Sequence, residues 1–187
     1  MRNVKTKTVK AGLSLLALVV AGTLAGCSTT STRAADVTGA IRTSLDNASY
    51  KDVSVTQDRD KGVVTLGGHV AADSDKAQAG SLAMSLAGAQ VVSNQIAVIP
   101  KGAESDAKKV NSDLDKGIEG NLDAALITAK LHGNVKYTVT NAVVTLTGDV
   151  DSQSARAQAQ DVAGAVPNVH QVVNELQVKA QKATSSN

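Results

Sequence analysis

The residues that could carry catalytic chemistry are few and widely separated in this sequence. The three histidines are His69, His132 and His170, and Cys27 is the only cysteine. No two histidines have the close spacing of a metal-binding helix motif, and one cysteine cannot build a thiolate site. We also find no nucleophile paired with a base and no pair of catalytic carboxylates. The sequence therefore predicts no catalytic residue, no metal ligand and no cofactor, and it favours a binding protein over an enzyme.

The acidic and glycine-containing stretches have structural explanations. Asp58 and Asp60 fall in a predicted turn, and Asp73 precedes a predicted helix, whereas a calcium loop needs more oxygen ligands in one compact segment. Gly67 and Gly68 lie within a predicted strand, which indicates a bulge or a close approach of backbone and not a phosphate loop. A hydrolase is accordingly the weakest of three functional hypotheses.

The first 26 residues predict a secretion signal. Four basic residues and no acidic residue precede an apolar stretch at 11–21, which is too short to span a bilayer comfortably. The sequence Leu24-Ala25-Gly26-Cys27 that follows resembles the lipobox of bacterial lipoproteins. The resemblance implies cleavage before Cys27 and acylation of Cys27, for example with palmitate. A plain secretory signal with an incidental cysteine is the alternative. Ser28, in place of an inner-membrane retention aspartate, implies the outer membrane, with the protein facing the periplasm.

Processing would reverse the sign of the net charge. Four of the 19 basic residues and none of the 17 acidic residues precede Cys27, so the mature chain would hold two more acidic than basic residues. A strongly basic surface for nucleic acid is therefore absent, and any contact with anionic lipid must be local.

An internal repeat dominates the rest of the sequence. Residues 62–98 align without a gap on residues 142–178 at a constant offset of 80, and 14 of the 37 positions are identical. Each half is therefore expected to be a separate unit with its own core.

Each unit has the same predicted order of elements, αββαβ. The first helix of each unit has one apolar face, made by Val37, Ile41, Leu45 and Ala48 or by Leu122, Ala125, Leu126 and Ala129. Strands follow at 53–56 and 63–70, or at 135–140 and 143–150, as a hairpin. The second helix presents Ala77, Leu82 and Leu86, or Ala155, Ala159, Val162 and Val166. The last strand covers 91–98 or 169–178.

The repeated pattern Val-Val-Thr-Leu-x-Gly-x-Val, then an Ala-rich helix, then Val-x-Asn-x-(Ile/Leu)-x-Val resembles the BON domain. The resemblance implies an α+β fold in which each module is a small three-stranded mixed sheet covered by two helices. It also implies binding of envelope phospholipid or envelope proteins without catalysis. Ala142 replaces the glycine that usually precedes Val-Val-Thr-Leu, and Gly88-Ala89 and Asn168-Val169 replace the usual Gly-Val before the last strand.

The predicted organisation has six segments. They are a signal peptide at 1–26, an acylated flexible tether at 27–34, the first BON domain at 35–100, a linker at 101–115, the second BON domain at 116–180 and an unstructured tail at 181–187. The linker could be flexible, but Val110, Leu114 and Ile118 recur at helical spacing. We therefore expect the first helix of the second module to extend backwards through the linker.

The second module has a candidate lipid-binding face. On a continuous helix, Ile127 and Leu131 lie near 140° and 180° from Leu122, and they would point away from the core. Lys130 lies beside them, and its ammonium could meet a lipid phosphate. Alternatively, this face docks on the first module, or the helix ends early and Leu131 turns inward.

The leading functional hypothesis is an envelope lipoprotein that binds phospholipid and supports outer-membrane integrity under stress. The alternative is a periplasmic adaptor or chaperone-like protein that binds envelope proteins through sheet edges and helix faces. Neither hypothesis involves nucleic acid or a small-molecule substrate.

Overall fold

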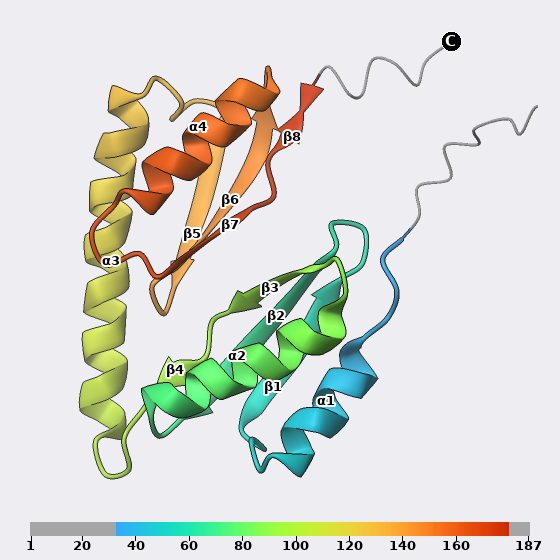
Figure 1. Ribbon diagram of the computed structural model, residues 1–187. Coiled ribbons are helices and arrows are strands. Elements are labelled where there is room, and N and C mark those ends of the chain that lie inside the picture. Colours follow the sequence, from blue (N-terminus) through green and yellow to red (C-terminus); the bar gives the residue numbers. More distant parts are fainter. Residues whose placement is uncertain (1–32, 180–187) are drawn as a thin grey trace, which may run out of the picture. The chain divides into compact units, whose positions relative to one another are not determined.

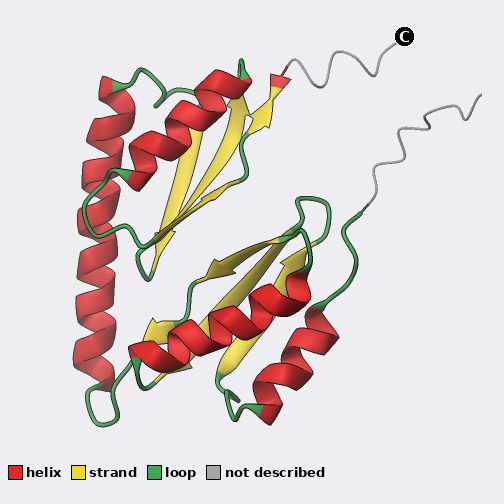
Figure 2. Cartoon of the chain, viewed as in Figure 1, coloured by secondary structure: helices red, strands yellow, loops and turns green. Residues whose placement is uncertain are grey.

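The computed structural model describes residues 33–179, which hold two copies of the order αββαβ (Figures 1 and 2). Cys27 and the rest of the predicted signal and lipobox lie outside the described residues. The first half contains α1 (Thr38–Asn47), β1 (Val53–Asp58), β2 (Val63–Val70), α2 (Asp73–Ala87), β3 (Val91–Asn94) and β4 (Ala97–Val98). The second half contains α3 (Glu104–Thr128), β5 (Val135–Thr140), β6 (Val143–Val150), α4 (Gln153–Gly164), β7 (Gln171–Asn174) and β8 (Gln177–Val178).

Each half forms a mixed sheet around its central strand. Strand β2 pairs antiparallel with β1 and parallel with β3 and β4, and β6 pairs in the same way with β5, β7 and β8. The predicted third strand is thus present as two segments. Its register does not change at the interruption, because Val63 pairs with Val91 and His69 pairs with Ala97 at the same separation along the chain.

The central strands pass very close to a neighbouring loop at one glycine each. A Cβ atom on Gly68 would lie 2.0 Å from the Asp52 carbonyl oxygen, and one on Gly148 would lie 2.4 Å from that of Asn134. Both glycines have positive φ, 83° and 120°. The predicted close approach of backbone at Gly67 and Gly68 is therefore confirmed, and the interruption of the third strand lies opposite it.

The first helix of each half buries most of the predicted face, but Ala48, which was predicted to belong to it, is exposed. Ile41 and Leu45 of α1 are fully buried, and Val37 packs against the same cluster. Leu122 and Leu126 of α3 hold the corresponding places in the second core. In each half the two helices contact each other and the same sheet (Figure 1).

The predicted buried face of α2 is correct only for Leu82, which packs against the core of the first half. Ala77 is exposed, Leu82 is only partly buried and Leu86 is 38% exposed. The residues that α2 buries are small: Ala79, Gly80, Ala83 and Ala87. Small side chains let the helix lie close to the sheet, and a Cβ atom on Gly80 would already lie 2.5 Å from the Asn94 amide nitrogen.

The buried face of α4 agrees with the prediction in part. Ala159 and Val166 are buried, whereas Ala155 and Val162 are only partly buried. Ala163, which the prediction omits, is fully buried. It aligns with Ala83 of α2, so the two second helices use equivalent small residues against their sheets.

Helix α3 begins well before the second core. It starts at Glu104 and continues without a break to Thr128, as the apolar spacing of the linker predicts. Its middle part is fixed to the β5–β6 turn by Asp115, whose two carboxylate oxygens accept the backbone N–H groups of Asn141 and Ala142 at 2.8 Å each. The linker is therefore a structural part of the second half.

The β5–β6 turn keeps its conformation although alanine replaces glycine. Ala142 has φ 64°, close to the 67° of Gly62 in the first half. Asn168 likewise has φ 66°, where Gly88 has 65°. Both departures from the family pattern thus preserve the left-handed backbone, which asparagine tolerates better than alanine does.

The described residues of both halves belong to one compact unit, and side chains join them. Gln171 of β7 donates to the Val92 carbonyl oxygen at 2.6 Å and accepts from the Asn94 backbone N–H at 3.0 Å. Val63, Val143 and Val173 form a small buried cluster. The Lys61 ammonium also contacts the Glu175 carboxylate at 2.6 Å, and the Glu175 side chain is only 11% exposed. These contacts join the two halves through polar and apolar groups.

Candidate functional site

The C-terminal end of α3 stops in a Schellman motif. The Lys130 N–H donates to the Ile127 carbonyl oxygen at 3.0 Å, and the Leu131 N–H donates to that of Leu126 at 2.9 Å. Lys130 takes the left-handed conformation, with φ 60°, that usually falls to glycine at this position. The motif reverses the chain direction immediately after the helix and brings Leu131 towards Leu126.

The prediction that Leu131 points outwards is therefore wrong. Its side chain is only 8% exposed and belongs to the core of the second half, together with Leu126. The angle of 180° from Leu122 assumed a helix that continues through residue 131, but α3 ends at Thr128. The early helix end, which was one of the two alternatives, is what the structure shows.

Ile127 and Lys130 remain on the surface. The Ile127 side chain is 56% exposed, and Lys130 is exposed beside it along the chain. At 100° per residue, Ile127 lies within about 60° of Ala124 on the helix. In the C-terminal part of α3, from residue 117 to residue 128, the exposed, uncharged residues on this side are Gly117, Gly120, Asn121, Ala124, Ile127 and Thr128. We call these six residues the α3 outer face.

One edge of the last turns of α3 is polar. The Asp123 carboxylate lies 2.9 Å from the His132 imidazole and accepts a hydrogen bond from the Tyr137 hydroxyl at 3.2 Å. Burial and the hydrogen bond to Asp123 raise the pKa of the Tyr137 hydroxyl. This cluster connects the helix end to β5 through Asp123, His132 and Tyr137.

The first half has no comparable apolar surface at the end of its first helix. Helix α1 ends in the same motif, with Ser49 in the left-handed conformation and the Tyr50 N–H bonded to the Leu45 carbonyl oxygen. Asp46 therefore takes the place that Ile127 has in the second half. Its carboxylate lies 2.7 Å from the Arg42 guanidinium. The two helix ends share a backbone but differ in surface chemistry.

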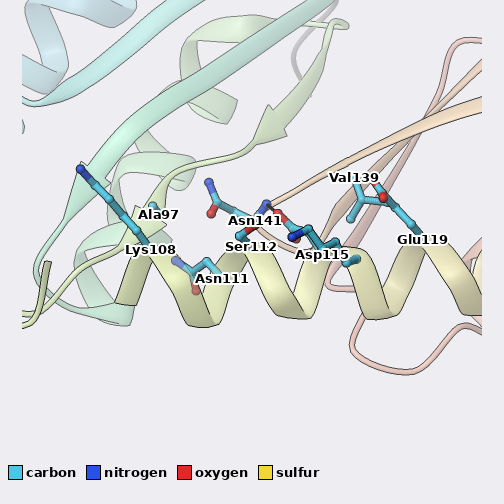
Figure 3. Close-up of a pocket in the computed structure, with 9 residues that line it drawn as sticks. Ala97, Lys108, Asn111, Ser112, Asp115, Glu119, Val139 and Asn141 are labelled. Atoms are coloured by element: carbon cyan, nitrogen blue, oxygen red, sulfur yellow. Dashed lines mark hydrogen bonds between the residues drawn. The ribbon is translucent and has the colours of Figure 1, made fainter. Parts of the chain in front are cut away.

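A pocket of about 340 Å³ lies along the middle of α3 (Figure 3). Its lining includes Asp115, Glu119, Val139 and Asn141, together with Ala97 of the first half. The Asp115 oxygens are already bonded to backbone of the β5–β6 turn. The Asn141 amide donates to the Gln95 carbonyl oxygen at 2.7 Å. These groups thus fix the fold at the junction of the two halves.

The histidines lie apart in the structure. His69 is on β2, His132 follows α3, and His170 precedes β7. Among residues 33–179, no three histidine, cysteine or acidic side chains are placed to hold a metal ion. Over the same residues, no helix combines the length and hydropathy needed to cross a membrane.

Comparison with known families shows which family these two halves represent. The BON domain matches the sequence twice, over residues 29–100 and 114–180. The chain belongs to the BON domain family. The two matches coincide with the two αββαβ halves, which we now call the first and second BON domains.

A curated relative supports the assignment. The chain is 34% identical over 136 residues to the osmotically-inducible protein Y of Escherichia coli (strain K12). The match covers 72% of this chain and 65% of the relative, so the chain spans less than two thirds of that protein.

Two solved structures of CdsD, a structural protein of the type III secretion system of Chlamydia trachomatis, are also similar. One, the C-terminal domain, is 14% identical with a TM-score of 0.31 and covers 73% of this chain and 61% of that chain. The other is 13% identical with a TM-score of 0.35 and covers 79% of this chain and 96% of that chain. Scores this low do not establish a common arrangement of the whole chains.

The structure explains one repeated residue whose role the sequence alone does not reveal. The Asn94 amide donates to the Lys76 carbonyl oxygen, and Asn174 donates to that of Arg156, both at 3.0 Å. In each BON domain this asparagine ties the last strand to the second helix. The asparagine occupies the same place of Val-x-Asn-x-(Ile/Leu) in both repeats, and this repetition was the only sign in the sequence that it has a structural role.

Proposed function

We propose that this protein is a non-catalytic lipoprotein of the bacterial envelope that binds phospholipid and supports outer-membrane integrity under stress. Membership of the BON family supports this proposal. So does the similarity to a protein named for osmotic induction, because osmotic stress acts on the envelope. The protein is anchored through acylated Cys27 and faces the periplasm.

The observation that carries the proposal is the difference between the two first helices. The second BON domain exposes Ile127 and Lys130. The first BON domain has Asp46 at the place of Ile127, and this carboxylate is paired with Arg42. Burial of the 56% of Ile127 that is exposed gains about 1 kcal/mol, about half the value for a fully exposed isoleucine, and a lysine near an anionic surface gains about 1 kcal/mol. The small, uncharged residues of the α3 outer face allow the helix to lie flat against headgroups. The second BON domain is thus the membrane-contacting domain.

The test uses residues 32–187, which lack Cys27 and form a compact unit. Flotation with vesicles of phosphatidylglycerol and phosphatidylcholine measures binding without the acyl anchor. We expect binding to the anionic vesicles. Ile127→Asp should weaken it by about thirtyfold, because about 1 kcal/mol of apolar burial is lost and the added negative charge costs about 1 kcal/mol beside the anionic surface. Lys130→Gln should weaken it by about fivefold.

Two features keep this experiment interpretable. Aspartate is what the first BON domain has at the place of Ile127, so Ile127→Asp should fold normally, and circular dichroism checks this. Lys51→Gln removes an exposed lysine near the equivalent turn of the first domain and should leave binding unchanged. Unchanged vesicle binding by well-folded Ile127→Asp refutes the assignment of the α3 outer face.

The membrane anchor needs a separate test in cells. Cys27→Ala should remain uncleaved or lose its membrane location, because several acyl chains on one cysteine account for stable attachment. Mass spectrometry of the purified protein detects the lipid on Cys27 directly. Normal processing and outer-membrane fractionation of Cys27→Ala would contradict the lipoprotein assignment.

One observation favours the second candidate, an adaptor or chaperone-like protein. Among the described strands, β1 pairs only with β2, and β5 pairs only with β6, so each of these two strands has an edge without a further strand. Such an edge can accept an extended segment of an envelope protein. Crosslinking from Thr138→Cys on β5 tests this, since an adaptor should capture envelope proteins there even when vesicle binding fails.

A further inference from the structure

A cleft of about 400 Å³ lies between the two BON domains, beside α2. This volume is within the range of small-molecule sites in proteins. One wall comes from the first domain and includes Lys76, Met84 and Val92, and the other comes from the second and includes Val143, His170 and Gln171. We call this the inter-domain cleft. It shares no residue with the α3 outer face.

The titratable groups that line this cleft are both basic. Lys76 is partly buried, and His170 enters the same cleft from the second domain. Within residues 33–179, no carboxylate lies within ion-pair distance of the Lys76 ammonium. Burial lowers the pKa of Lys76, and the more distant Asp73 and Asp115 act in the opposite direction. Because the Lys76 ammonium is partly desolvated and has no close carboxylate, binding of an anionic ligand in the cleft would stabilise its charge.

The rest of the lining is largely apolar. Met84 is 58% exposed, although methionine gains free energy by burial, and its flexible thioether can adapt to an irregular alkyl chain. Val92 and Val143 add buried aliphatic surface from the two domains. The Gln171 amide is already bonded to β3, so it fixes the cleft wall.

We propose that the inter-domain cleft binds an anionic amphiphile whose charged group lies beside Lys76 and His170. The alkyl chain lies against Met84, Val92 and Val143. A free fatty acid and a single-chain phosphate lipid share this chemistry of one anionic group on one chain. The site is independent of the proposed membrane contact, because it uses other elements and other residues.

Met84 provides a direct probe of this site. It is the only native methionine of residues 32–187, since the sequence has two and the other is Met1. We would titrate this fragment, with its methionine methyl group labelled with ¹³C, with decanoate, decyl phosphate or the neutral decanol below their micelle concentrations. Decanoate or decyl phosphate should shift the Met84 methyl resonance with one-to-one stoichiometry. Decanol should bind about tenfold more weakly, because it cannot form a charge-assisted hydrogen bond.

Matched variants separate the role of the cation from the role of the fold. Lys76→Gln removes the charge without adding a second labelled methionine and should weaken decanoate binding by about tenfold, whereas Lys76→Arg should keep it. Lys51→Gln should behave like the wild type. A stronger response to decanoate than to decyl phosphate assigns a fatty acid, and the reverse assigns a phosphate lipid.

Three results overturn the proposal. They are equal affinity for decanol and both anions, unchanged affinity of Lys76→Gln, or no effect of any of the three compounds on the Met84 methyl group. Vesicle flotation of the same Lys76→Gln sample should remain normal. Loss of flotation would show that the cleft and the α3 outer face are not separate sites.

Discussion

Replacement of Gly68 by alanine should destabilise the first BON domain far more than replacement of Gly62. Both glycines have a left-handed backbone, with φ 83° and 67°. At Gly62 an added Cβ meets nothing within 4 Å, whereas at Gly68 it lies 2.0 Å from the Asp52 carbonyl oxygen. The comparison therefore separates backbone strain, which both variants have, from steric overlap, which only one has.

The magnitudes follow from these contacts. A left-handed alanine costs about 1–2 kcal/mol, and the reduced entropy of the unfolded chain returns about 0.4–1 kcal/mol. We expect Gly62→Ala to cost about 1 kcal/mol, and Ala142 occupies the equivalent position in the second domain. At Gly68 the backbone must also shift, which threatens the pairing with Val53 and the hydrogen bond from the His69 N–H to Asp52. Gly68→Ala should therefore cost about 3 kcal/mol or more.

Urea unfolding of residues 32–187, followed by circular dichroism, measures both costs. Tyr50 and Tyr137, one in each domain, let NMR report which domain unfolds first. The first domain should lose its structure at lower urea in Gly68→Ala, with the Tyr50 signals changing before those of Tyr137. Equal costs for Gly68→Ala and Gly62→Ala would refute the reasoning, because the close approach would then have no energetic weight.

Three further predictions concern the second domain and its contacts. Leu131→Ala should lower the free energy of unfolding by about 2–5 kcal/mol, because this side chain is buried. A loss below 1 kcal/mol in urea unfolding would indicate that Leu131 points outwards. Asp115→Asn should lower the free energy of unfolding by about 2 kcal/mol, since the amide offers only one acceptor oxygen to the two backbone N–H groups of the turn. A Tm equal to that of the wild type would contradict this prediction. The hydrogen bond to Glu175 raises the pKa of Lys61 above its ordinary value of 10.5, so its stabilising contribution is present below pH 10.5 and is lost as pH rises through the raised pKa. The difference in Tm between wild type and Lys61→Met should therefore shrink above pH 10.5, and a constant difference would exclude this contact as its source.

Much of the fold could be predicted because the repeat supplies two independent versions of each element. The hairpins, the buried faces of α1 and α3 and the backward extension of α3 all follow from apolar spacing. The face of α2 could not be assigned in this way. Its sequence is rich in alanine, serine and leucine, so apolar residues lie on every side of the helix. The choice of Ala79 and Ala83 depends on how close the helix lies to the sheet, which is a tertiary property.

The candidate site was predicted only in part for a related reason. Ile127 is exposed as expected, but Leu131 is buried because the chain turns at Lys130. A helix end is usually marked by glycine, and lysine gives no such signal. Comparison of Ser49-Tyr50 with Lys130-Leu131 at an offset of 81 could have revealed the turn, because Tyr50 also follows a predicted helix end.

The hydrogen bonds of Gln171 have a consequence for self-association. Strand β3 lies at the edge of its sheet, and edge strands are sites where a second copy of a chain can add and start aggregation. The Gln171 side chain binds one carbonyl oxygen and one N–H of β3, as a neighbouring strand would, so these groups cannot pair with another molecule. The equivalent residue of the first domain is Val91, which cannot do the same for β7. The second domain thus occupies these two groups of β3, and separation of the two domains would leave them open to a second copy of the chain.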